Sequence, residues 1–189
     1  MVFLIENCFH WLGFHIVNHL LENGYHIDGV DDINTGKKEH LSMFVGRNEL
    51  FRHVSSQRDK EYDATIGVYD RELIVKTNRP VTIKLPLVFG EWMPMNQEGM
   101  YSQHEFIRFD TQQFASEGVY IDSFLKSLLQ WLHSSDLPST LEVKSSHDRQ
   151  RTKIKLENTV YIRNNRPINQ SLNTVKHHYE MYKNIYELL

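Results

Sequence analysis

The chain has 189 residues, of which 40% are hydrophobic and 24% are charged, a balance that is ordinary for a single globular domain. Its formal net charge of −3 provides no basic footprint, so we expect no nucleic-acid partner. The single cysteine, Cys8, excludes a disulfide within the chain and fits a reducing compartment. No apolar run approaches the ~18 residues that a membrane span needs, and no secretion signal is recognisable at the start. We therefore expect a cytoplasmic protein without a membrane partner.

The start of the chain predicts a strand, a helix and a second strand. Residues 2–5 are all apolar, as in a strand that is buried on both faces. Over residues 11–21 the apolar side chains recur at helical spacing, and the Asn-Gly pair that follows is typical of a helix end. Residues 25–30 predict the second strand, which a polar turn closes at residues 31–36. The three elements make a βαβ unit.

The rest of the chain predicts shorter elements with weaker patterns. Residues 92–118 show little periodicity, so we expect them to be irregular. The other expected elements are a strand at 50–54, a helix at 62–76, strands at 80–85, 141–143 and 159–162, a strand that turns into a helix at 119–132, and a tail helix at 171–189.

Three stretches of this sequence resemble the extended short-chain dehydrogenase/reductase family, the NAD-dependent epimerases and dehydratases of nucleotide sugars. The first covers residues 3–41, where DDINTGKK matches the family's acidic residue, N-L-S-T-G and basic pair. The second is VTIKLPLVFGEWMPM, which is similar to the family's strand ending in V-Y-G-P-W. The third is VYID at residues 119–122, which resembles the family's V-Y-V-D-D before a helix.

The resemblance implies an α/β fold: a truncated Rossmann-like parallel sheet flanked by helices, with a small C-terminal lobe. Residues 1–90 would form the shortened Rossmann-like core, and residues 91–189 would form the lobe that resembles the family's substrate-binding part. We expect the two to make one compact unit. The substrate-type positions that the resemblance assigns are Val88, Gly90, Trp92, Tyr120 and Asp122.

The stretch that corresponds to the family's cofactor loop, T-G-x-x-G-x-x-G, departs from it. Asn7 and His10 stand at the first two glycine positions, and only the third remains, as Gly13. Those glycines allow a tight turn, close approach of the pyrophosphate and close helix packing, so the side chains of Asn7 and His10 would occupy the diphosphate's space. Asp31 stands where the family holds the adenosine ribose. We expect no cofactor, with NAD at Gly13 and Asp31 as the alternative.

The catalytic tyrosine and lysine of the family also lack a full match. The stretch from Tyr62 to Ile66 resembles the family's Y-G-A-T-K, with Ile66 in the place of the lysine. A spacing of four places both on one face of a helix, so Tyr62 would lack the cation that lowers a tyrosine pKa. Ser55 is the candidate for the family's serine. If the chain is active, the resemblance makes Tyr62 and Ser55 catalytic; the isoleucine predicts inactivity.

The chain is also short before Tyr62. The family has several βα units there, and this sequence has room for one strand. At about thirty residues per βαβ unit, at least two units are absent, including strands that form one wall of the nicotinamide pocket. We expect the loss to leave apolar surface uncovered, where a partner could bind.

Two further features could carry chemistry. His15 and His19 are four residues apart and could both reach one metal ion, but no cysteine or carboxylate ligand pattern accompanies them, so we expect no metal. Cys8 lies at the start of the first helix, where the helix dipole could favour the thiolate. The alternative is a small buried residue.

The sequence therefore predicts a non-catalytic homologue, or pseudoenzyme, of the nucleotide-sugar epimerases and dehydratases that acts by binding a partner or a ligand. One alternative is an active, atypical NAD-dependent member. Another is a UDP-sugar sensor that binds through residues 87–95 and 119–122. The resemblance implies bacterial polysaccharide biosynthesis as the setting, a homo-oligomer or an active relative as the partner, and a sugar nucleotide as the ligand.

Overall fold

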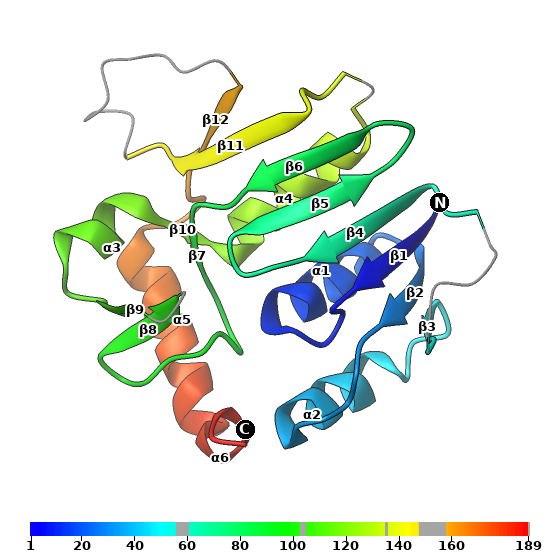
Figure 1. Cartoon of the computed structure of the whole chain (residues 1–189). Coiled ribbons are helices and arrows are strands. Elements are labelled where there is room, and N and C mark those ends of the chain that lie inside the picture. The colour runs from blue at the N-terminus through cyan, green and yellow to red at the C-terminus, as the bar shows by residue number, and fades with distance from the viewer. Residues whose placement is uncertain (56–60, 103–104, 135, 148–157, 189) are drawn as a thin grey trace.

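The computed structural model describes residues 1–55, 61–102, 105–134, 136–147 and 158–188 (Figure 1). The first elements are β1 (Val2–Glu6), α1 (Trp11–Glu22), β2 (His26–Val30), α2 (Gly36–Val45) and β3 (Phe51–His53). They are followed by β4 (Ala64–Val68), β5 (Glu72–Lys76), β6 (Pro80–Lys84), β7 (Leu87–Phe89), β8 (Gly99–Ser102) and β9 (Glu105–Arg108). The last are α3 (Gln112–Glu117), β10 (Gly118–Tyr120), α4 (Ile121–Leu132), β11 (Thr140–Ser145), β12 (Thr159–Ile162), α5 (Ile168–Met181) and α6 (Lys183–Tyr186).

Eight strands form one sheet in the order β12-β11-β6-β5-β4-β1-β2-β3. All neighbours are parallel except β5, which runs antiparallel to both β4 and β6. Phe3, Leu4 and Ile5 of β1 are each 0% exposed, as in a central strand that is covered on both faces. The expected α/β fold, a largely parallel Rossmann-like sheet flanked by helices, is confirmed. Among the described helices, none is long and apolar enough to span a membrane.

The helix expected at residues 62–76 is wrong, because this stretch forms β4 and β5. All five residues of β4 are buried, and the strand pairs with β1 along its length. In β5, Leu73 and Val75 are buried while their neighbours are more exposed, which is the alternation of a half-buried strand. A turn at residues 69–71 separates the two patterns. When residues 62–76 are taken as one continuous segment, the apolar residues of the two strands have a spacing similar to that of a helix.

Two hairpins stand where further βα units would continue a doubly wound sheet. Residues 69–71 join β4 to β5, and residues 77–79 join β5 to β6. Connections this short suit antiparallel neighbours, whereas parallel neighbours need a crossover of a dozen residues or more. Helices α1 and α4 contact each other and lie behind the sheet in the view of Figure 1. The hairpins thus extend the sheet without adding helices to its other face.

The face of the sheet that points away from α1 and α4 is polar at β5, β6 and β11. Glu72, Lys84 and Glu142 are direct neighbours across these three strands, and Lys144 pairs with Glu142 at 3.4 Å. Opposite charges in register stabilise neighbouring strands. The outward face of these strands is thus largely polar, with Ile74 of β5 half-buried on it. The expectation of uncovered apolar surface stays a prediction. Large exposed apolar side chains occur elsewhere, among them Phe44 of α2 and Phe106 of β9.

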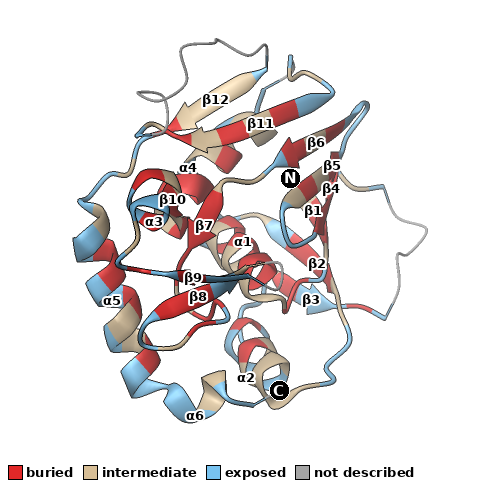
Figure 2. Ribbon diagram, turned by 60° about the vertical axis from the view of Figure 1, so that its left-hand side comes forward, coloured by how far each residue is buried: buried red, intermediate tan, exposed pale blue. Residues whose placement is uncertain are grey.

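Residues beyond 90 contribute both to the main sheet and to a second apolar cluster. The strands expected at 141–143 and 159–162 are present as β11 and β12, and both belong to the main sheet. The second cluster includes Phe89, Phe114 and Tyr179, and Figure 2 shows β7 and β10 beside it as largely buried. The stretch expected to be irregular, 92–118, contains β8, β9 and α3. A division at residue 90 remains a prediction.

Helix α1 packs closely on the turn that precedes it. The turn is closed by the His10 N–H, which donates to the Asn7 carbonyl oxygen at 3.1 Å, and Asn7 has a left-handed φ of 57°. A Cβ atom at Gly13 would lie 2.2 Å from that same carbonyl oxygen. Gly13 therefore serves the packing of α1 on the turn, with or without a ligand.

We predict that Gly13→Ala destabilises the protein. Alanine normally stabilises a helix interior by up to about 1 kcal/mol over glycine, but here the Asn7 carbonyl group would have to move. We expect the free energy of unfolding to fall by about 2 kcal/mol or more, measured by urea denaturation followed by circular dichroism.

Gly24→Ala is the control, because a Cβ atom there meets nothing within 4 Å and only the left-handed φ of 78° opposes it. Its expected cost is about 1 kcal/mol. A loss in Gly13→Ala no larger than that of Gly24→Ala would contradict the packing role.

Candidate functional site

The carboxyl ends of β1 and β4 mark the point where the chain changes sides in the sheet. β2 and β3 lie on one side of β1, and β4 lies on the other. Ligands of open α/β sheets bind in the crevice at such a switch point. A cavity of about 300 Å³ lies here, lined by Asn7, His10, Lys38, Val68, Tyr69 and Asp70. It shares His10 and Asp70 with a second cavity of about 210 Å³ that reaches Val88 of β7.

The turn between β1 and α1 uses its hydrogen-bond donors within the protein. The Asn7 side chain donates through Nδ2 to the Val68 carbonyl oxygen at 2.8 Å. The Cys8 N–H donates to the Val30 carbonyl oxygen at 3.4 Å, and the Phe9 N–H donates to Asp31 Oδ2 at 2.8 Å. A phosphate-binding turn leaves such N–H groups for its ligand. This turn is closed onto β2 and β4 instead.

Two side chains of the same turn fill the space beneath it. Cys8 is 0% exposed and Phe9 is 1% exposed. The Phe9 ring lies 5.0 Å from the His53 ring and 6.2 Å from the Phe51 ring. A Cβ atom at Gly29 would lie 2.8 Å from Cys8 Sγ, so β2 also depends on a glycine to fit this packing.

The carboxylate of Asp31, the predicted ribose-binding residue, is fully engaged. Its side chain is 3% exposed. Oδ2 accepts from the Phe9 N–H, while Oδ1 accepts from Lys38 Nζ at 2.6 Å and from the Asp32 N–H at 2.8 Å. A dinucleotide bound in the family's manner would have to displace these contacts, and Asn7 and His10 would meet its diphosphate. The residues present do not fit NAD in that manner.

His10 borders both cavities and keeps an uncharged imidazole. Burial lowers its pKa, and the nearby lysine ammonium groups lower it further, against the opposing charges of Asp70 and Asp31. No residue in the described part of the chain offers its Nδ1 atom a hydrogen-bond partner. A buried nitrogen of the neutral His10 ring is therefore without a hydrogen-bond partner among the described residues beside these cavities.

The structure separates the predicted catalytic residues. Ser55 follows β3 at the carboxyl edge of the sheet, whereas Tyr62 precedes β4 at the opposite edge. The Tyr62 hydroxyl donates to Asp28 Oδ2 at 3.0 Å. Ile66 is 0% exposed in the middle of β4, so Tyr62 and Ile66 do not share a helix face.

The two stretches that carry the substrate-type positions do come together, because β7 pairs in parallel with β10. Val88 lines the second cavity, and a Cβ atom at Gly90 would lie 2.5 Å from Ile121 Cγ2. The Tyr120 hydroxyl donates to Glu91 Oε1 at 2.9 Å. Of these positions, only Val88 borders the crevice at the switch point.

The other two substrate-type residues point elsewhere. Asp122 is paired with Lys126 at 2.8 Å on the exposed face of α4. Trp92 is 7% exposed and stacks on Tyr186, with the ring centroids 5.2 Å apart. Its ring lies beside the C-terminal segment and beside His40 of α2, so it belongs to a different part of the molecule.

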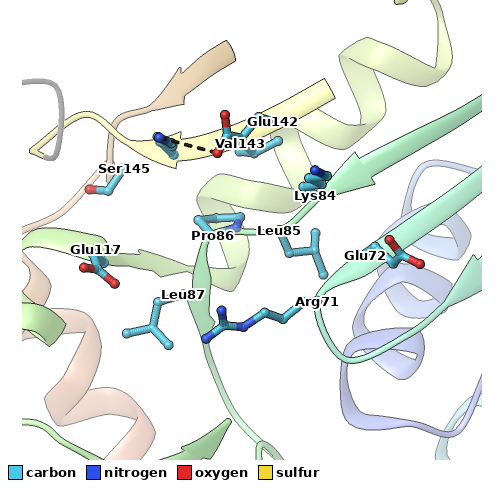
Figure 3. Close-up of a pocket in the computed structure, with 11 residues that line it drawn as sticks. Arg71, Glu72, Lys84, Leu85, Pro86, Leu87, Glu117, Glu142, Val143 and Ser145 are labelled. Carbon is cyan, nitrogen blue, oxygen red and sulfur yellow. Dashed lines mark ion pairs between the residues drawn. The ribbon is translucent and has the colours of Figure 1, made fainter. Parts of the chain in front are cut away.

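A cavity of about 450 Å³ adjoins the crevice at the carboxyl ends of β6 and β11. In Figure 3, Arg71 reaches from the β4–β5 turn across it towards Leu87. The Leu85 N–H donates to the Arg71 carbonyl oxygen at 2.7 Å, which fixes that turn against the end of β6. Within the described part of the chain, the guanidinium of Arg71 makes no ion pair, so it can meet an anionic ligand.

Charged side chains from several elements line this cavity. Lys84 and Lys144 supply two more cations, and Glu72, Glu117 and Glu142 supply carboxylates. The sequence interpretation missed Arg71 because it placed residues 62–76 on one helix. The signal was present: the charged pair Asp70-Arg71 comes one residue after a fully buried strand.

Comparisons with known proteins identify no family for this chain. No family model matches the chain. Over 185 residues the chain is 25% identical to the protein named "Uncharacterized protein YjaV" of Bacillus subtilis (strain 168), an alignment that covers 80% of this chain and 90% of that protein. The similarity extends over most of both proteins, and the name states no activity.

We predict that Tyr62→Phe lowers stability. The hydroxyl donates to Asp28, whose side chain is 6% exposed and pairs with Arg52 at 2.6 Å. The variant removes one donor from a buried carboxylate, so the free energy of unfolding should fall by about 1–2 kcal/mol in urea denaturation. Tyr69→Phe, at a 44% exposed tyrosine, is the control and should change it by less than about 0.5 kcal/mol. Equal effects of the two variants would contradict this role.

We also predict that Cys8 is unreactive in the folded protein. Burial raises the pKa of its thiol, and the charge of Asp31 raises it further, outweighing the lowering by Lys38. The thiolate is the reactive form, so iodoacetamide at about pH 8 should label the unfolded chain but not the native one. Labelling of the native protein at the rate of a free thiol would instead support the helix-dipole hypothesis.

Proposed function

We propose that this chain is a non-catalytic relative of the NAD-dependent nucleotide-sugar epimerases and dehydratases that binds a sugar nucleotide without NAD. The observation that carries the proposal is the closed turn between β1 and α1, whose donors and side chains contact the protein itself. A cofactor that is gripped at that turn is the requirement for hydride chemistry in this family. Polysaccharide biosynthesis, with a second copy or an active relative as partner, is the setting we propose.

The cavity around Arg71 supports the choice of an anionic ligand. Its volume of about 450 Å³ is in the usual range for small-molecule sites. Arg71 and Lys84 extend into it from two different strand ends, and a guanidinium can hold a phosphate oxygen through two N–H groups at once. Ser145 and the carboxylates offer partners for sugar hydroxyls. These are the contacts that a diphosphate joined to a sugar would need.

The test is calorimetric titration of the purified protein with UDP-glucose and, separately, with NAD. We expect saturable binding of UDP-glucose and no measurable binding of NAD. Arg71→Ala should lower the affinity for UDP-glucose at least about tenfold, because a hydrogen bond to a charged group contributes about 1.5–3 kcal/mol. Arg79→Ala is the matched control, since Arg79 is exposed in the β5–β6 turn at the other end of the same hairpins.

Two results would overturn the proposal. Micromolar affinity for NAD would mean that the turn opens for a diphosphate. Conversion of a UDP-sugar, lost in Tyr62→Phe while the variant stays folded, would establish the active enzyme. If Arg71→Ala and Arg79→Ala lowered the affinity for UDP-glucose equally, the cavity around Arg71 would not be the binding site.

A further inference from the structure

A second large cavity lies among the helices, outside the crevice at the carboxyl edge. Its volume is about 410 Å³, and it is bordered by α1, α2, the stretch after β7 and the end of α5. Aromatic rings dominate its lining, with Phe14, Phe44, Trp92 and Tyr182 as members. Phe44 is 61% exposed and Tyr182 is 38% exposed, so rings at the rim are open to a ligand.

A strained residue holds the rings together. Trp92 has a left-handed φ of 64°, which costs energy in any residue other than glycine. Its backbone N–H donates to the Tyr186 hydroxyl at 2.6 Å. The centroid of its ring lies 5.3 Å from that of Tyr182 and 5.2 Å from that of His40. The contacts of the C-terminal helices with Trp92 offset the strain. They also hold the rings of Trp92, Tyr182 and His40 in place along one side of the cavity.

The charge in this cavity is negative. Glu91 lines it, and Oε1 of its carboxylate is positioned by the Tyr120 hydroxyl. Among the residues that the structure describes, no lysine or arginine lines the cavity. A cation does lie over one of the neighbouring aromatic rings: Lys37 Nζ is 5.2 Å from the centroid of the Tyr186 ring. Ring faces are electron-rich and attract cations, as that contact illustrates.

We propose that this cavity binds a small organic cation, an ammonium compound with apolar substituents, between the aromatic rings and Glu91. The rings would contact the substituents and attract the charge, and the carboxylate would complete the charge balance. The site lies apart from the Arg71 cavity, so the proposal stands whether or not the chain binds a sugar nucleotide.

We expect the affinity for the cation to fall at acidic pH. Burial lowers the pKa of His15 and of His178, and neighbouring imidazoles lower that of His178 further, so both rings are neutral near pH 7 and become charged only on acidification. Protonation would place positive charge beside the site and repel the ligand. The titratable and charged groups that face these rings are His15, His40, His177, His178, Tyr182, Tyr186, Glu22, Glu91 and, over Tyr186, Lys37.

The test is a pair of NMR titrations of the full chain, one with choline and one with 3,3-dimethylbutan-1-ol. The two molecules have nearly the same shape, but a tert-butyl group replaces the trimethylammonium group in the second. We expect choline to bind at least about fivefold more tightly, with chemical-shift changes centred on His40, Glu91 and Tyr182. Choline affinity should fall as the pH is lowered from about 7.5 to about 5.5.

Two variants with matched controls locate the site. Glu91→Gln keeps an acceptor for the Tyr120 hydroxyl and removes the charge, whereas Glu98→Gln makes the same change at an exposed residue paired with Arg108. Phe44→Ala removes an exposed ring, and Phe106→Ala does so on β9, where the ring is 40% exposed. Glu91→Gln and Phe44→Ala should each lower the affinity for choline severalfold. The controls Glu98→Gln and Phe106→Ala should leave it unchanged.

Three results of the titrations with the unmodified chain would overturn the proposal. They are equal affinity for choline and its neutral analogue, shift changes that avoid the cavity, and an affinity that rises on acidification. Because Phe44 is exposed, its variant should fold, and unchanged choline binding by folded Phe44→Ala would also count against the site.

Discussion

The close approach of helix α1 to the turn before it is the constraint on which the rest of the structure depends. A side chain at residue 13 would collide with the Asn7 carbonyl oxygen, so only glycine lets α1 lie where it does. That position presses Cys8 and Phe9 into the core and directs the Phe9 N–H to Asp31. The same packing accompanies an intact βαβ unit in which the N–H groups of Cys8, Phe9 and His10 all donate within the protein. The βαβ fold and the closed turn therefore have the same physical origin.

The replacement of crossover units by hairpins explains the shape of the candidate site. Because β4, β5 and β6 are joined by short turns, the β4–β5 turn lies at the carboxyl edge and carries Arg71 there. A crossover helix would have taken the chain away from that edge. The outward face of the same strands carries charged residues in register, among them Glu72 and Lys84, which is how a mostly parallel sheet can leave one face without helices.

Much of the fold could be predicted from the sequence, and the errors have clear causes. The strand at residues 2–5 and helix α1 follow from strong, local apolar patterns. Helix α2 was missed because only Leu41 and Val45 are buried on it, so its periodicity is weak. Residues 62–76 were misread because β4 is buried on both faces, and a continuous apolar run does not distinguish a strand from a helix. That error also hid Arg71 and linked Tyr62 to Ile66.

The sequence by itself determined the βαβ start and the turn with Asn7, His10 and Gly13. These are local patterns, which neighbouring residues specify by spacing and size. Only the tertiary structure decided which residues share a site. Trp92 meets Tyr186 across 94 residues of sequence, and Arg71 reaches its cavity because distant strands end beside it. Such contacts depend on how packed elements close upon each other, and no spacing along the chain encodes that.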